Sequence, residues 1–265
     1  MKFDLCIIDC DPLVYRCGFS VEKYDKEADI LTVEPAKHAF YNINSMFRYC
    51  LKMSETDNYK GFLTASDKSN FRFQLFPEYK ANRKDARRPF YYNEIRDFLV
   101  KRWSAEIVSG LEADDACSVT QCAYNPFGFD PEAGTSIVWS FDKDFNNIPG
   151  WHGNFVTKEI YYISPLEALK HFYLQILTGD NSDGIPRVRK GWRQKEAEQA
   201  INYCTTEEQM LDIVYNVIYT LNIDRPNNRE ETHKDIYIRG NLVWLRRNWK
   251  EVWTPPLSRT LLLNN

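Results

Sequence analysis

Short apolar runs alternate with longer amphipathic stretches along the chain. Apolar runs of roughly four to eight residues that end at polar residues are typical of buried strands. Such runs cover residues 3–8, 61–65, 105–108 and 137–141, and a strand pair is expected within 155–163. Apolar residues at helical spacing predict helices. These helices cover residues 35–51, 112–123, 166–177 and 207–221, and the polar stretch 224–234 is expected to be a loop.

The alternation of strands and helices decides the fold class. It predicts an α/β fold in which a central, mainly parallel, twisted sheet is flanked by helices. No internal repeat, low-complexity tract or linker is evident in the sequence. We therefore expect one domain over residues 1–265.

Composition narrows the classes of protein to which the chain can belong. Of the 265 residues, 43% are hydrophobic and 15% are aromatic, which excludes an intrinsically disordered chain. No apolar run approaches the roughly 18 residues of a membrane span, and Asp4, Asp9 and Asp11 interrupt the region where a secretory signal would be apolar. The seven cysteines include no CxxC pair, which favours reduced thiols over disulfides or a zinc site. We expect a cytoplasmic protein with no membrane partner.

The net charge of −3 hides a segregated distribution. Residues 78–103 hold eight basic against four acidic residues, and residues 184–195 and 239–250 hold basic residues and no acidic ones. Each run alone is typical of a solvated surface. Three such runs in one acidic chain indicate a polyanionic partner.

The acidic residues fall repeatedly where predicted strands end. In open α/β sheets, ligands bind beyond the carboxyl ends of the strands, so these side chains are expected to converge. They are Asp9, Asp67, Glu112, Asp114, Asp115, Asp142 and Asp144, joined by Asp180 and Asp183 in the sequence TGDNSDG.

So many carboxylates in one pocket would repel one another unless positive charge balances them. Mg²⁺ takes one or two direct carboxylates and keeps several waters, so a pair of such ions accommodates a large acidic set. Asp67, Asp142 and Asp183 could each be a helix cap instead, although capping does not account for EADD, DKD and GDNSD together.

The order of these blocks resembles the 5′-nuclease superfamily, which comprises flap endonucleases and 5′→3′ exonucleases, and is most similar to the bacteriophage exonucleases. The blocks are IIDCD, SDKSNFRFQLFPEYKANR, LEADD, SFDKDF and GDNSDGIP, and the resemblance runs from Asp9 to about Ile201. It implies a central sheet with a helical arch over about 71–103 and a helix-hairpin-helix-like element over about 180–202.

The resemblance also assigns roles to the acidic residues. It implies that Asp9, Asp67, Glu112, Asp114 and Asp115 hold one Mg²⁺ ion. It also implies that Asp142, Asp144 and Asp183, together with Asp180, hold or orient a second ion. We expect that Mn²⁺ can replace Mg²⁺ at both positions. Asp11 is outside the family pattern, and its position before Pro12 predicts a helix cap.

Basic residues are expected near the cut phosphate and along the arch. The resemblance implies that Lys80 and Arg83 engage the phosphate near the cut, that Arg72 faces the same groove, and that Lys84, Arg87 and Arg88 extend the arch. Lys80 and Arg83 are three residues apart, so one helical face can present both. The aromatic residues Phe90, Tyr91, Tyr92 and Trp103 suit either base stacking or core packing.

The hairpin element departs from the family pattern. Where the family carries a glycine-rich run close to IPGVPGIG, this chain reads IPRVRKGW. Bulky residues resist the backbone conformations that glycine permits, which argues against a K⁺ site and favours direct contacts from side chains. The expected contacts come from Arg187, Arg189, Lys190, Arg193 and Lys195.

The expected function is a monomeric, phage-encoded 5′→3′ exonuclease or flap endonuclease of the bacterial host cytoplasm. Its partner would be DNA with a free 5′ end, a flap or a nick, and an RNA–DNA hybrid is a further expected substrate. Two enzymes are alternatives: a haloacid-dehalogenase-type phosphatase, suggested by DCDPL, and a PIN-like ribonuclease. A DNA-binding module with a degenerate site is the non-enzymatic alternative.

Overall fold

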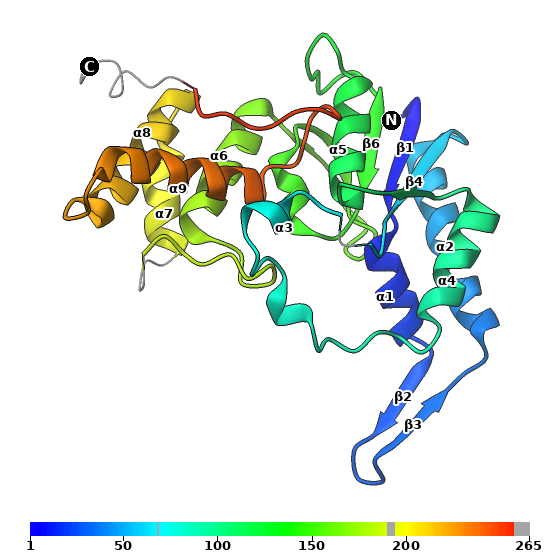
Figure 1. Ribbon diagram of the computed structural model, residues 1–265. Helices are drawn as coiled ribbons and strands as arrows, with labels where there is room; N and C mark the ends of the chain where they lie inside the picture. Colours follow the sequence, from blue (N-terminus) through cyan, green and yellow to red (C-terminus); the bar gives the residue numbers. More distant parts are fainter. Residues whose placement is uncertain (68, 190–193, 257–265) are drawn as a thin grey trace.

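A six-stranded sheet forms the centre of the protein, whose computed structural model describes residues 1–67, 69–189 and 194–256 (Figure 1). The strand order is β5-β4-β1-β6-β7-β8. All neighbouring pairs are parallel except β7 with β8, which is antiparallel. The strands are β1 (Leu5–Asp9), β4 (Tyr59–Thr64), β5 (Glu106–Val108), β6 (Ser136–Trp139), β7 (Gly150–Gly153) and β8 (Ile160–Ile163). The predicted mainly parallel sheet is confirmed.

Helices cover both faces of this sheet, which explains why β1 is apolar on both sides. Cys6 and Ile8 of β1 pack in the core formed with α1 (Asp11–Phe19), α2 (Ala36–Ser54) and α4 (Tyr92–Trp103). Leu5 and Ile7 point to the opposite face and pack against α5 (Ala113–Ala123). All five residues of β1 and all four of β6 are buried.

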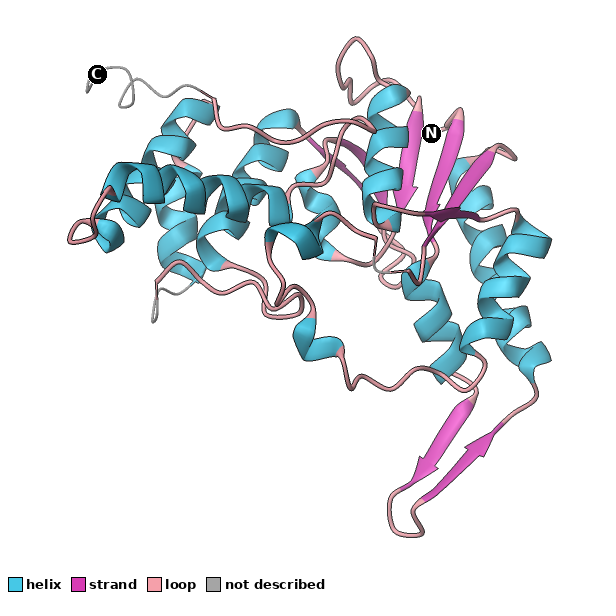
Figure 2. Ribbon diagram, in the orientation of Figure 1, coloured by secondary structure: helices cyan, strands magenta, loops and turns pink. Residues whose placement is uncertain are grey.

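A helical unit with a core of its own lies beside the sheet (Figure 2). It contains α6 (Pro165–Thr178), α7 (Gln194–Asn202), α8 (Glu207–Asn222) and α9 (Asn228–Val243). Ser164 with Glu167 and Thr206 with Gln209 form capping boxes that fix where α6 and α8 begin. Phe172, Leu211 and Ile236 meet in its buried core.

The expected loop over 224–234 is wrong, because α9 begins at Asn228. Before Gly240 only Thr232 and Ile236 of this helix are buried, and most other positions in that part are polar. Two buried residues give no strong apolar period, so the sequence pattern did not reveal the helix. The strand pair expected within 155–163 is also misplaced, since β8 pairs with the earlier β7.

The connection between the two units is less helical than expected. After α3 (Arg72–Leu75) the chain forms only a single 3₁₀ turn, η1 (Ala81–Arg83), before α4 begins at Tyr92. The helical arch predicted over 71–103 is therefore wrong for residues 84–91. This segment crosses from the helical unit to α1 and α4 beyond the carboxyl ends of the strands (Figure 1).

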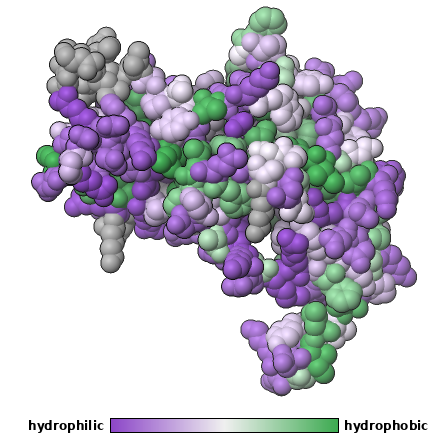
Figure 3. Space-filling view, in the orientation of Figure 1, coloured by the Kyte–Doolittle hydropathy of each residue, from purple (hydrophilic) through white to green (hydrophobic). Residues whose placement is uncertain are grey.

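A two-stranded hairpin that the sequence did not predict projects from the body of the protein (Figure 1). It pairs β2 (Glu22–Asp25) with β3 (Ile30–Val33). Tyr24 and Ile30 are each 56% exposed. Polar and apolar residues therefore lie together on this projection (Figure 3).

All seven cysteines lie in the described part of the chain, and all are free thiols. Across residues 1–67, 69–189 and 194–256, no helix is both long and apolar enough to cross a bilayer.

Replacement of Gly240 by alanine tests the packing of α9 against the C-terminal segment. A Cβ atom at this position would lie 2.1 Å from Cζ3 of Trp253, whose backbone is held by two hydrogen bonds with Asn241. We expect Gly240→Ala to lower the free energy of unfolding by about 1–3 kcal/mol in urea titrations, as overpacked cores do. Helix propensity alone predicts the opposite, a gain of about 1 kcal/mol, and that result would contradict this packing.

Candidate active site

A cleft of about 680 Å³ lies at the carboxyl ends of β1, β4 and β6. Its lining includes acidic side chains from these strand ends and from the start of α5, together with basic side chains from segment 80–96. The acidic residues are Asp9, Asp11, Asp67, Glu112, Asp114 and Asp142, and the basic ones on that segment are Lys80, Arg83, Arg88 and Arg96. The structure thus brings together residues that are far apart in sequence.

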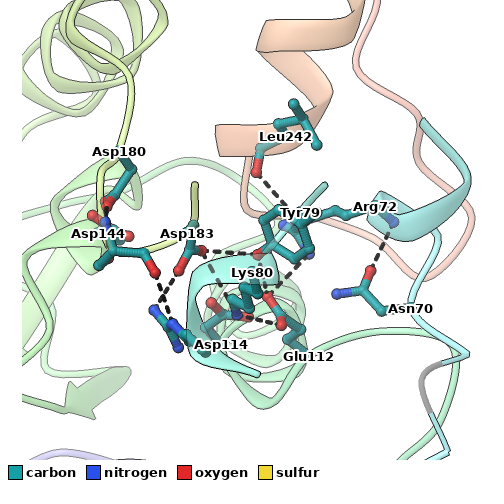
Figure 4. A network of polar contacts seen from close by, with 12 residues as sticks. Asn70, Arg72, Tyr79, Lys80, Glu112, Asp114, Asp144, Asp180, Asp183 and Leu242 are labelled. Carbon is teal, nitrogen blue, oxygen red and sulfur yellow. Dashed lines mark hydrogen bonds and ion pairs between the residues drawn. The ribbon is translucent and has the colours of Figure 1, made fainter. Parts of the chain in front are cut away.

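A second group of carboxylates surrounds a small cavity of about 20 Å³ (Figure 4). Asp144, Asp180 and Asp183 line this cavity, and Glu112 and Asp114 line both it and the larger cleft. Eight of the nine predicted ligands therefore line one of two adjoining spaces. Their role as metal ligands stays a prediction.

Several of these carboxylates lack a compensating positive charge. Burial, followed by the charges of Asp11 and Asp142, raises the pKa of Asp9 well above its ordinary value. Burial and the charge of Glu112 do the same for the pKa of Asp114. The pKa of Asp144 rises to about 7, through burial and then the charges of Asp142 and Asp180. These groups carry a proton more readily than free carboxylates unless a cation arrives.

Other carboxylates are neutralised by the protein itself. Burial opposes ionisation of Glu112, but Lys80 and Arg72 outweigh it and hold the pKa of Glu112 at about 2. Lys80 Nζ forms an ion pair with Glu112, and Arg83 forms one with Asp183. Tyr79, which is buried, donates its hydroxyl to these same two carboxylates, at 2.8 Å from Glu112 Oε2 and 2.9 Å from Asp183 Oδ2.

The donor set fits a hard divalent cation. All candidate ligands are carboxylates, the oxygen donors that Mg²⁺ and Mn²⁺ prefer. Asp180 Oδ2 is buried without a hydrogen bond, and the nearest cation, Lys143 Nζ, is 3.8 Å away. Within residues 1–67, 69–189 and 194–256, no three His, Cys, Asp or Glu side chains stand in ligand positions around one point. The ion pairs of Lys80 and Arg83 account for this in part, because they hold Glu112 and Asp183.

Asp115 does not belong to the carboxylates that face the cleft. It is completely buried, and its oxygens accept two hydrogen bonds from the Arg72 guanidinium, at 2.6 and 2.9 Å. The backbone amides of Glu112 and Arg246 donate to it as well, at 3.2 and 3.1 Å. The expectation that Asp115 holds a metal ion is corrected, since its lone pairs are already used.

The predicted position of Arg72 in the groove also needs correction. Arg72 is 1% exposed, and besides Asp115 it donates to the carbonyl oxygens of Leu242 and Trp244, at 3.0 and 2.8 Å. It does not line the larger cleft, and it borders only the small cavity, where its guanidinium lies 3.7 Å from Glu112 Oε2. It joins α3, the start of α5 and the end of α9 beneath the floor of the site.

Lys80 and Arg83 do line the cleft, although not from one face of an α-helix. Lys80 has φ = 56° and precedes the 3₁₀ turn that contains Arg83. Lys80 N donates to Asp183 O at 2.8 Å, and Asn82 Nδ2 donates to Asn181 O at 2.7 Å. The turn is thus fixed to the GDNSD loop through the backbone amide of Lys80 and the side chain of Asn82.

The remaining predicted DNA-binding residues differ in placement. Arg88 lines the cleft, stacked 4.6 Å over the Tyr92 ring, and Lys84 is exposed. Arg87 pairs with Glu22 at the base of the hairpin while its side chain stays 55% exposed, and its role as a phosphate contact stays a prediction. Arg187, Arg189 and Lys195 are exposed, whereas Lys190 and Arg193 lie outside the described residues.

The segment expected to form a helix-hairpin-helix-like element is only partly described. A tight turn follows α6, closed by reciprocal backbone hydrogen bonds between Asp180 and Ile185. Gly179 is required at its start, because it has φ = 65° and a Cβ atom would lie 2.4 Å from Ile185 O. The helix α7 begins at Gln194, directly after the undescribed residues. That this element lacks a K⁺ site stays a prediction.

Two residues near the cleft were not recognised correctly from the sequence. Asp11 makes no cap; it accepts a hydrogen bond from Thr64 N at 3.2 Å and pairs with Arg96 at 3.4 Å. Tyr79 was missed as a buried partner of the carboxylates, although it directly precedes Lys80. Of the aromatic candidates, Trp103 is buried against Phe47, whereas Phe90 is 62% exposed.

Comparison with known proteins identifies the architecture. No family model matches the chain. A crystal structure of the T5 D15 protein with metal ions has a TM-score of 0.59 at 18% identity, covering 91% of this chain and 89% of that one. A T5 5′-exonuclease structure has a TM-score of 0.55 at 16% identity, covering 92% and 88%. The chain has the 5′-nuclease fold.

Two phage proteins are similar to this chain in sequence. An exonuclease of Escherichia phage T7 is 34% identical over 134 residues, and an exodeoxyribonuclease of Enterobacteria phage T3 is 33% identical over the same length. Each match covers 49% of this chain and 43% of the relative. The matched region therefore spans less than half the length of these relatives.

Asp115→Asn tests whether the buried pair with Arg72 fixes this site. Loss of the charge leaves the Arg72 guanidinium buried without its partner, so we expect the free energy of unfolding to fall by about 3–5 kcal/mol in urea titrations. Asp114→Asn is the matched control, because it removes a neighbouring charge that has no ion-pair partner among the described residues. We expect this control to leave the stability unchanged or higher. Equal effects of the two substitutions would contradict the structural role of Asp115.

Proposed function

We propose that the chain is a divalent-metal-dependent 5′→3′ exonuclease and flap endonuclease. The observation that carries this proposal is the convergence of Asp9, Asp114 and Asp142 in a cleft that Lys80 and Arg83 also line. Uncompensated carboxylates beside fixed cations suit a substrate whose phosphate is cut with the help of metal ions.

The carboxylates divide into two sets toward these ions. Asp9, Asp67, Glu112 and Asp114 would hold one Mg²⁺, and Asp142, Asp144, Asp180 and Asp183 would hold or orient a second, with Mn²⁺ as a substitute. When bound, the two ions supply Lewis acidity for attack of water on a phosphodiester, which leaves a 5′-phosphate and a 3′-hydroxyl. The protein's own part is to fix the carboxylates on strand ends and on α5.

The basic residues would bind and orient the substrate. Lys80 and Arg83, which line the cleft, would contact the phosphate at the cut, where fixed cations stabilise the developing charge. Arg88 lines the same cleft, and Arg187, Arg189 and Lys195 would contact duplex phosphates without reading bases. Segment 71–103 would form the wall through which a 5′ strand passes, and 180–202 would grip the duplex, within one nuclease domain.

The comparisons support the substrate class. A solved structure similar to this chain is a T5 flap endonuclease in a product complex with DNA and metal ions, with a TM-score of 0.59 at 18% identity. The phage T7 and T3 relatives are named as an exonuclease and an exodeoxyribonuclease. We propose DNA with a free 5′ end, a flap or a nick as the substrate, and an RNA–DNA hybrid as a second one. A phosphatase using Asp9 as nucleophile would leave Glu112, Asp114 and Lys80 without a function.

Asp142→Asn is the direct test of the metal assignment. Asp142 Oδ1 accepts a hydrogen bond from Asp144 N at 3.0 Å, and an asparagine keeps this acceptor while it removes the charge. We expect Mg²⁺-dependent release of 5′-mononucleotides from labelled duplex and flap DNA to fall by about 100-fold or more. Asp85→Asn, in the exposed segment after η1, is the control and should keep full activity. Undiminished cleavage by Asp142→Asn would overturn the assignment.

A further inference from the structure

The two cations proposed to hold the substrate phosphate are bound to carboxylates proposed to hold metal ions. Lys80 Nζ pairs with Glu112 Oε1 and lies 3.7 Å from Asp183 Oδ2. The Arg83 guanidinium pairs with Asp183 Oδ1 and also donates through Nε to Ser182 O at 2.8 Å. These contacts are drawn together in Figure 4 for Lys80, Glu112 and Asp183.

The surroundings make the Lys80–Glu112 ion pair strong. Glu112 is 8% exposed, and the Lys80 side chain is 20% exposed. Attraction between opposite charges is less screened at such a site than on an open surface. An oxygen that faces an ammonium group cannot bind a divalent cation at the same time, because the two positive charges repel each other.

The side chains can exchange partners without movement of the backbone. Lys80 N remains bonded to Asp183 O, and Asn82 Nδ2 to Asn181 O, whichever group the side chains of Lys80 and Arg83 contact. Both side chains already line the larger cleft. A change of rotamer therefore suffices to turn them from the carboxylates to a phosphate in that cleft.

We propose that Lys80 and Arg83 form an internal lock on Glu112 and Asp183, which divalent metal ions open by displacing both cations toward the substrate phosphate. This inference rests on the proposed function, in which those carboxylates bind metal and those cations bind phosphate. In the metal-free protein the lock neutralises buried carboxylates. In the metal-loaded protein the same cations are free to bind DNA, so metal binding prepares the site for its substrate.

The affinity for Mn²⁺ in the absence of DNA tests the lock without any measurement of cleavage. Titration of the full chain, followed by the electron paramagnetic resonance signal of free Mn²⁺, gives this affinity for the wild type and for Lys80→Met. Removal of the competing cation should tighten Mn²⁺ binding about tenfold. Lys84→Met, which removes an exposed lysine from the same segment, is the matched control and should stay within about twofold of the wild type.

A second readout covers the case in which Lys80→Met folds poorly. Arg83→Gln removes a more exposed cation, 48% accessible at its side chain, and should give a smaller gain of Mn²⁺ affinity in the same direction. The rise in melting temperature on addition of Mn²⁺ should be larger for both variants than for the wild type.

The outcomes separate this inference from the proposed function. If both variants bind Mn²⁺ no more tightly than Lys84→Met, the lock is wrong while the metal site stands. If the wild type and every variant fail to bind Mn²⁺, the metal-dependent function is wrong and the lock falls with it.

Discussion

Mutual repulsion of carboxylates at one edge of a parallel sheet is the constraint around which this structure is organised. The protein balances some of them with its own cations: Arg72 with Asp115, Lys80 with Glu112, Arg83 with Asp183 and Arg96 with Asp11. No ion pair from a described residue reaches Asp9, Asp114, Asp142 or Asp144. These four groups mark where positive charge is missing.

The internal cations differ in what they can later do. Arg72 is buried and bound to the carbonyl oxygens of Leu242 and Trp244 at the end of α9, so it holds the floor of the site in place. Lys80 and Arg83 line the larger cleft, and in the proposed lock they change partners when metal ions bind. The 5′-nuclease fold thus uses one buried arginine to join its two cores and two accessible cations to work at the cleft.

The sequence predicted those parts of the protein that carry a strong local pattern. Buried strands such as β1 and β6 and capped helices such as α6 have such patterns, and the order of acidic blocks predicted the convergence of carboxylates at the strand ends. Which cation pairs with which carboxylate was not predictable, because these pairs are contacts between residues distant in sequence. Asp115 and Asp114 are adjacent in sequence, yet one lies under Arg72 and the other faces the cleft.

Two further errors have the same origin. Asp11 resembles a cap beside Pro12, but the nearby strand β4 and α4 offer it Thr64 and Arg96 instead. The resemblance implied a helix over 84–91, whereas in the structure Glu22 of the hairpin pairs with Arg87 and accepts a hydrogen bond from Phe90 N. Local propensity could not reveal either tertiary contact.

Anomalous diffraction from crystals soaked in Mn²⁺ tests the central claim most directly, because it locates the ions without reference to activity. The account predicts density in the space bordered by Asp9, Asp114 and Asp142, with a second site beside Asp144 and Asp180. Crystals that bind Mn²⁺ elsewhere, with none between these carboxylates, would contradict it.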